Sequence, residues 1–173
     1  MGRVIGIDYS TTSTGIAIAA GGQWETFSLE SAPTGRTLGD YYDRIIDLAY
    51  RIESVLHDGD VLGIEGIAFA GRGSSVDRLH YAWHRTVEHL TTRHSALHVV
   101  TTNQVKQLAT GKGNANKDEV LLATERRIPQ TRVSNNDEAD AVWIAVGASI
   151  LAGSPVIDLP AAHMPKAWKE KVA

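Results

Sequence analysis

The spacing of hydrophobic and polar positions predicts a β-meander at the start of the chain. Three apolar runs rich in β-formers cover about residues 3–9, 14–20 and 23–29. The pair Gly21-Gly22 suits the positive backbone angles of a tight hairpin between the last two runs. Asp8 lies at the carboxyl end of the first strand, and burying its ionised carboxylate costs several kcal/mol unless a cation or hydrogen bonds compensate it. We therefore expect Asp8 to have a partner.

Helical periodicity alternates with short apolar runs over the rest of the chain. The predicted elements are, in order, a helix over 37–57, a strand over 61–69 parallel to the first strand, a helix over 75–94, a strand over 97–102, a short helix capped by Asn103, and helices over about 117–127 and 134–152. The Pro-interrupted tail beyond Pro155 is expected on the surface or disordered. This order predicts an α/β protein with a five-stranded mixed sheet and helices on both faces, as in the ribonuclease H-like arrangement.

Composition sets the domain count and the expected compartment. A chain of 173 residues with 43% hydrophobic composition is long enough for one core. We expect a single domain over 1–153, followed by a tail over 154–173. The absence of cysteine excludes disulfides and thiolate metal sites and fits a reducing compartment. No apolar run has the length of a membrane span and the N-terminus lacks a signal-peptide pattern, so we expect a cytoplasmic protein.

Charge is unevenly distributed along the chain. Residues 70–132 carry 10 Lys and Arg against 5 Asp and Glu, whereas residues 1–69 carry 4 against 10 and residues 133–173 carry 3 against 5. The basic side chains are thus concentrated in the middle of the chain. From charge alone, this distribution fits either an ordinary solvated surface or a phosphate-binding surface.

Four acidic residues are candidates for one metal site. Asp8 ends the first strand, Glu65 lies in the strand expected beside it, and Asp137 and Asp140 share one helix face. Phosphoryl transfer uses such carboxylates to hold two magnesium ions roughly 4 Å apart. Three of the acids also have a structural alternative: Asp137 could form a capping box with Ser134, Asp8 could serve as a turn residue, and Glu65 could lie on an exposed strand. Asp140 lies beyond the first turn of its helix and is harder to explain in this way.

Four stretches resemble, in order, the landmarks of RuvC-type Holliday junction resolvases: IGIDYSTTSTGIAI, GIEGIAF, NQVKQLATGKGNANK and NNDEADAVWIA. The resemblance spans residues 4 to about 150. It implies a homodimer that binds four-way or other branched DNA and makes paired symmetric nicks by two-metal-ion phosphodiester hydrolysis. It also implies Mg²⁺ as cofactor, for which Mn²⁺ can substitute, and no membrane partner.

The resemblance also implies roles for individual residues. Asp8, Glu65, Asp137 and Asp140 correspond to the metal-binding acids. Lys106 and Lys117 correspond to catalytic lysines near the scissile phosphate. The helix over 75–94 would carry the dimer interface, where Tyr81 and Trp83 offer aromatic area, although packing against the sheet is the alternative. Contacts to DNA are expected from Phe69, Arg72, Arg78, Lys106, Lys112 and Lys117.

Two departures from the family pattern concern DNA recognition. Tyr9-Ser10 stands where the family has Pro-Gly, and Ala68 stands where the family has its stacking aromatic residue. Phe69, one position later, is either the wedge at the junction centre or a core residue. Such divergence suits a bacteriophage-encoded member acting in the host cytoplasm.

Other functions share parts of the pattern. The stretch GIDYSTTSTG also resembles the first phosphate loop of sugar kinases and actin-like ATPases. Those proteins need a second glycine-rich loop and an adenosine site, for which 173 residues leave little room. A flap or RNA nuclease of the same fold, and a catalytically inactive junction-binding module, are further alternatives. The four acids favour a nuclease.

Overall fold

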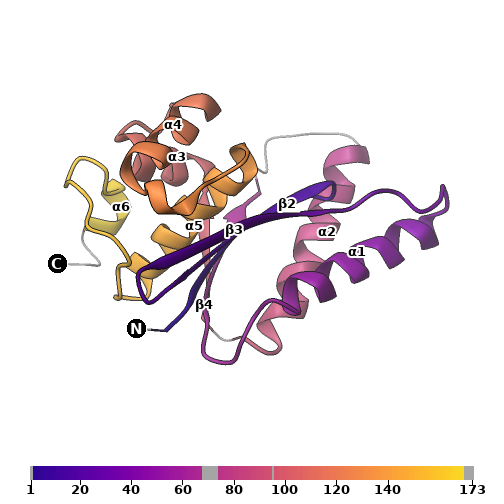
Figure 1. The fold of residues 1–173 in the computed structure, drawn as a ribbon. Helices are drawn as coiled ribbons and strands as arrows, with labels where there is room; N and C mark the ends of the chain where they lie inside the picture. Colours follow the sequence, from indigo (N-terminus) through magenta and orange to yellow (C-terminus); the bar gives the residue numbers. More distant parts are fainter. Residues whose placement is uncertain (1, 68–73, 95, 170–173) are drawn as a thin grey trace.

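A five-stranded mixed sheet forms the centre of the molecule (Figure 1). In this computed structural model, the described residues are 2–67, 74–94 and 96–169. The strands are β1 (Val4–Asp8), β2 (Ser13–Ala20), β3 (Gln23–Glu30), β4 (Val61–Gly66) and β5 (Leu97–Thr101). The order is β3-β2-β1-β4-β5, antiparallel from β3 to β1 and parallel from β1 to β5. The predicted five-stranded mixed sheet is confirmed.

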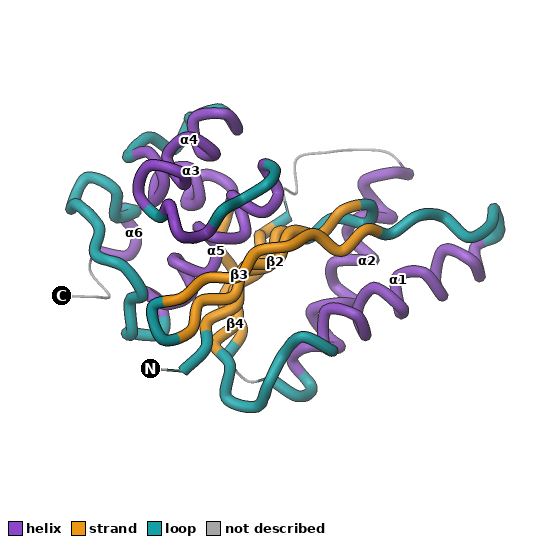
Figure 2. Tube along the Cα trace, in the orientation of Figure 1, coloured by secondary structure: helices purple, strands orange, loops and turns teal. Residues whose placement is uncertain are grey.

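Helices cover both faces of the sheet, as predicted (Figure 2). They are α1 (Leu38–Glu53), α2 (Ser74–Thr91), α3 (Thr102–Thr110), α4 (Lys117–Arg127), α5 (Asn136–Leu151) and α6 (Lys166–Lys169), with a 3₁₀ turn η1 (Pro129–Thr131). On one face, α1 and α2 pack on the isoleucines of β1 and β2. On the other, α5 packs on β1, β2 and β4. None of the described helices is long and apolar enough to cross a membrane.

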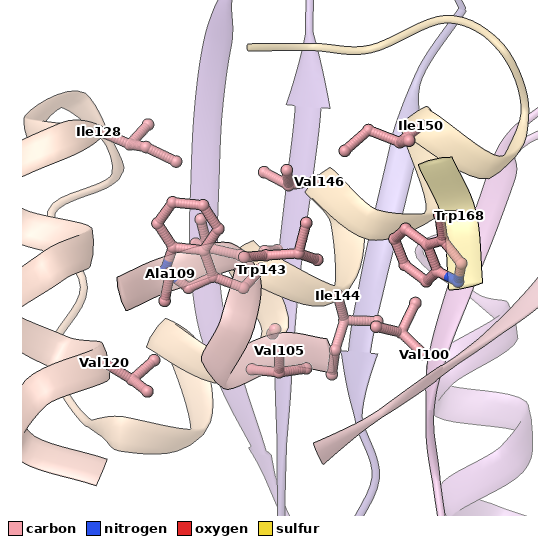
Figure 3. Packing of buried hydrophobic residues seen from close by; sticks show 14 residues of the cluster. Val100, Val105, Ala109, Val120, Ile128, Trp143, Ile144, Val146, Ile150 and Trp168 are labelled. Atoms are coloured by element: carbon pink, nitrogen blue, oxygen red, sulfur yellow. The ribbon is translucent and has the colours of Figure 1, made fainter. Parts of the chain in front are cut away.

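The core beneath α5 is built around a fully buried tryptophan. Trp143 lies among aliphatic side chains from several elements (Figure 3). Its Nε1 donates to Thr124 Oγ1 at 2.8 Å. The helix is buried on nearly every side, because it is apolar all round. This burial fixes α5 as a rigid element against the sheet.

Glycines on the strands allow α5 to approach the sheet backbone. A Cβ on Gly63 would lie 2.8 Å from the carbonyl oxygen of Ile144. A Cβ on Gly15 would lie 3.0 Å from the Glu138 nitrogen and closer still to the carbonyl of Asp137. Glycine inside a strand marks such close backbone approach. These glycines therefore set the height of α5 above the sheet.

Turn and cap residues account for the element boundaries. Gly21 and Gly22 have φ of 58° and 81°, which confirms the predicted hairpin. Thr101, rather than Asn103, caps α3, because its side chain accepts from the Gln104 backbone nitrogen as β5 passes directly into the helix. Similarly, α5 begins at Asn136 and is capped by Asn135, so the expected start at Ser134 was two residues early.

The C-terminal tail differs from the expectation of a surface or disordered segment. It forms α6, and Trp168 is only 5% exposed within the main core cluster. His163 is buried as well. The apolar area of the tryptophan explains why this segment packs on the domain although prolines interrupt it.

Candidate active site

Asp8 lies at the carboxyl end of β1, in the middle of the sheet. Its side chain is buried, and its register partner on β2 is Gly15. Burial, and after it the negative charges of Glu65, Asp140 and Asp137, together raise the pKa of Asp8 to about 9. Burial and these neighbouring acids both disfavour the ionised form of Asp8, which is why the sequence led us to expect a compensating partner.

Asp140 lies in the second turn of α5, where it is also buried. Burial is the main cause that raises its pKa to about 6, and the negative charges of Glu65 and Asp137 add to the rise. The positive charges of Lys117 and Lys106 act in the opposite direction. Glu65 and Asp137 thus act on both Asp8 and Asp140. The folded chain brings together all four predicted acids, called below the site carboxylates, and both predicted catalytic lysines.

The start of α5 is fixed in a way that leaves the Asp137 carboxylate available. The Asn135 side chain caps the helix by accepting from the Glu138 nitrogen at 2.9 Å, so Ser134 and Asp137 form no capping box. The buried Glu138 carboxylate accepts from Ser28 Oγ at 3.2 Å and from the Ser134 nitrogen at 2.8 Å. Asp137 instead lies 3.9 Å from Lys117 Nζ.

Glu65 is held by two residues that the sequence prediction did not assign to the site. Thr102 Oγ1, at the start of α3, donates to Glu65 Oε1 at 2.9 Å. Trp83 Nε1, from α2, donates to the Glu65 backbone oxygen at 2.7 Å. Trp83 is 8% exposed, so core packing, rather than a dimer contact, accounts for it. The position of Thr102 just beyond the strand next to β4 was the signal that could have identified it.

The remaining predicted DNA contacts lie in different places. Lys117 is the first residue of α4 and its side chain is largely exposed, whereas Lys106 in α3 is half-buried. Lys112 lines a hollow of about 450 Å³ with Arg126 and Arg127.

Arg78 lies on the other side of the sheet, over the Tyr41 ring at 5.7 Å from its centroid. It lines a hollow of about 540 Å³ that also includes Arg36 and Arg44. The predictions for Phe69 and Arg72 lie outside the described residues.

The donor set fits a hard divalent cation. All four acids supply carboxylate oxygens, the ligands that Mg²⁺ prefers. Two of these side chains are buried with raised pKa values, so positive charge between them would relieve an unfavourable arrangement. Within the described part of the chain, no group of three or more His, Asp or Glu side chains is arranged to hold a metal ion. The site carboxylates therefore interact electrostatically without forming a finished ligand cage.

Comparisons with known proteins identify the family and the fold. The family model of crossover junction endodeoxyribonuclease RuvC matches residues 4–148. The chain is also similar to the structure of Thermus thermophilus RuvC, with 20% identity and a TM-score of 0.65 over 88% of this chain and 98% of that chain. A second structure, T. thermophilus RuvC in complex with Holliday junction substrate, gives 20% identity and a TM-score of 0.69 over 90% and 98%. The predicted ribonuclease H-like fold is confirmed.

Proposed function

The chain belongs to the RuvC family of crossover junction endodeoxyribonucleases, and from this premise we propose that it resolves four-way DNA junctions at the site carboxylates. The observation that carries the proposal is that Asp8, buried at the end of β1, lies close enough to Glu65 on β4 and to Asp137 and Asp140 on α5 for their charges to raise its pKa. Acids gathered at one point in this way can hold the metal ions that catalyse phosphodiester hydrolysis.

We infer that the site carboxylates hold two Mg²⁺ ions, with Mn²⁺ as a possible substitute. When bound, the ions activate water and stabilise the charge of the leaving oxygen. Asp8 and Asp140 supply oxygens from buried positions, while Thr102 keeps the Glu65 carboxylate turned in one direction. Lys117, beside Asp137, neutralises charge that develops on the phosphate.

DNA binding in this proposal depends on cations around the site. The charges of Lys106 and Lys117 act on Asp140, and Lys112 lies in the turn between their two helices. Arg78 contributes from the other face of the sheet, next to Arg36 and Arg44. Contacts of this kind bind phosphates without reading sequence, so affinity falls with increasing salt.

We propose that the homodimer forms through an aromatic face on α1 and α2. On α1, Leu38, Tyr42, Ile46 and Tyr50 recur at every fourth position, and all four are exposed. On α2, exposed Tyr81 lies with its ring centroid 4.9 Å from that of Tyr42. Exposed aromatic side chains of this density are typical of protein interfaces. Tyr81→Glu should shift the sedimentation coefficient toward that of a monomer.

An immobile four-way junction with Mg²⁺ tests the proposed function directly. Nicks mapped on all four strands should occur in symmetric pairs, and Asp8→Asn should abolish them while junction binding persists. Asp58→Asn, in an exposed turn, is the matched control and should cleave as the wild type does. Equal cleavage of flaps or linear duplex would indicate a broader nuclease. Saturable ATP binding by calorimetry, without nicking, would favour the kinase-like alternative.

A further inference from the structure

The C-terminal strap, residues 155–169, contacts the region that carries two of the basic residues of the site. This strap lies beyond residue 148, where the family match ends. Trp168 anchors it in the core cluster that contains Val100, Ile144 and Ile150 (Figure 3). The strap is therefore a built part of the domain that the family pattern does not describe.

His163 links the strap to the ends of two helices. Its Nδ1 donates to the Leu108 carbonyl at 2.8 Å, one of the carbonyls left free at the C-terminus of α3. Its Nε2 lies 3.0 Å from Arg127, at the end of α4. A carbonyl only accepts and a guanidinium only donates, so the neutral imidazole with its hydrogen on Nδ1 satisfies both contacts.

Gln107 links the strap to the basic turn, defined as residues 111–116. Its Nε2 donates to the Gly111 carbonyl at 2.8 Å and to the Ala162 carbonyl at 2.6 Å. Gly111 has a φ of 81°, and a Cβ there would lie 3.2 Å from His163 Nε2. The turn therefore bends against the imidazole at a position that favours glycine.

The basic turn connects these contacts to the site. Lys112 follows Gly111 directly, and its nitrogen and carbonyl contact Thr110 Oγ1 at 3.1 and 3.2 Å. At the other end of the turn, Asn116 caps α4, whose first residue is Lys117. Displacement of the turn would therefore move Lys112 and Lys117 relative to Asp137.

We propose that Gln107 and His163 are positioning residues, through which the strap holds the basic turn in the conformation that presents Lys112 and Lys117 to DNA phosphates. The role in catalysis rests on the proposed nuclease function. The holding of the turn does not, because it is measurable without DNA or metal.

Hydrogen–deuterium exchange of the full-length protein measures the holding directly. Gln107→Ala should increase exchange of the amides in residues 111–116, and Gln130→Ala, an exposed glutamine in η1, should not. His163→Asn retains an amide donor near the Nδ1 position, whereas His163→Gln extends toward the Nε2 position. Exchange should therefore increase in His163→Gln, which loses the bond to the Leu108 carbonyl, and in His163→Asn, which loses the contact with Arg127. Unchanged exchange in Gln107→Ala and in both His163 variants would overturn the proposal.

Junction cleavage then tests the consequence. Gln107→Ala should lower kcat on saturating junction roughly tenfold, which corresponds to about 1.4 kcal/mol of activation free energy. The assay is carried out well below the temperature at which the variant unfolds. A purely structural role would lower the melting temperature and leave kcat of the folded protein unchanged, which would also overturn the proposal. If the wild type nicks no junction, the proposed function fails, while the exchange result still decides the role of the strap.

Discussion

Replacing Gly15 by alanine should separate the site carboxylates while leaving all of them in the chain. The added Cβ would lie 3.0 Å from the Glu138 nitrogen and closer to the Asp137 carbonyl, whereas carbon contacts are optimal at roughly 3.5–4.0 Å. Both contacts are with backbone atoms, so no side chain can rotate away. The N-terminal turn of α5 must therefore retreat by about 1 Å, taking Asp137 with it.

The expected cost has two parts that separate assays can measure. Overpacking of a close contact lowers the free energy of unfolding by about 1–3 kcal/mol, measured by denaturant titration. Misplacement of a catalytic group by about 1 Å lowers the cleavage rate about 100-fold, measured in a single turnover on junction DNA at a temperature where the variant is folded. The loss of rate should therefore exceed any loss of folded protein.

Gly39→Ala is the matched control for this experiment. Gly39 lies inside α1, and the nearest atom to an added Cβ is Thr37 Oγ1 at 3.6 Å, an ordinary contact. Alanine in that helix should leave cleavage unchanged and stabilise the fold by up to about 1 kcal/mol. If Gly15→Ala cleaves as fast as Gly39→Ala, the glycine does not set the position of the acids, and the reasoning is wrong.

Three further predictions follow from the same contacts. Because the pKa of Asp8 is raised to about 9, the metal-free folded chain keeps a proton that the unfolded chain releases, and its stability should fall as the pH rises from about 4 to 9 in chelator. Thermal unfolding of Asp8→Asn should show a weaker fall of stability with pH, and an equally steep fall would contradict this role of Asp8. Thr102→Ala should lower kcat roughly threefold to tenfold, because it loses the 2.9 Å hydrogen bond to Glu65. Thr102→Ser should keep most of the wild-type kcat, and equal kcat values in the two variants would count against a positioning role. Lys112→Ala should reduce the slope of log affinity against log salt by about 1, measured by junction binding without metal, and an unchanged slope would show that Lys112 makes no phosphate contact.

The sheet was predictable because its strands carry strong local signals. Aliphatic runs and a Gly-Gly hairpin gave the meander, and helical spacing gave the crossovers between parallel strands. The boundaries were less predictable, because Thr101 and Asn103 are both good caps and the backbone geometry at the end of β5 chose Thr101. The packing of the tail depends on the distant partners of Trp168, which local periodicity does not reveal.

The site shows the same division between local and distant information. Asp8, Glu65 and Asp140 were identifiable because a carboxylate among aliphatic residues is a conspicuous departure from the pattern. Thr102 gave no such signal, since threonine is ordinary at the end of a strand, and its role depends on its distance from Glu65. The strand glycines were visible in the sequence as interruptions of apolar runs, and their meaning emerges only where α5 lies against them. The acids are thus the basis of the proposed chemistry, and the less conspicuous residues around them determine where those acids lie.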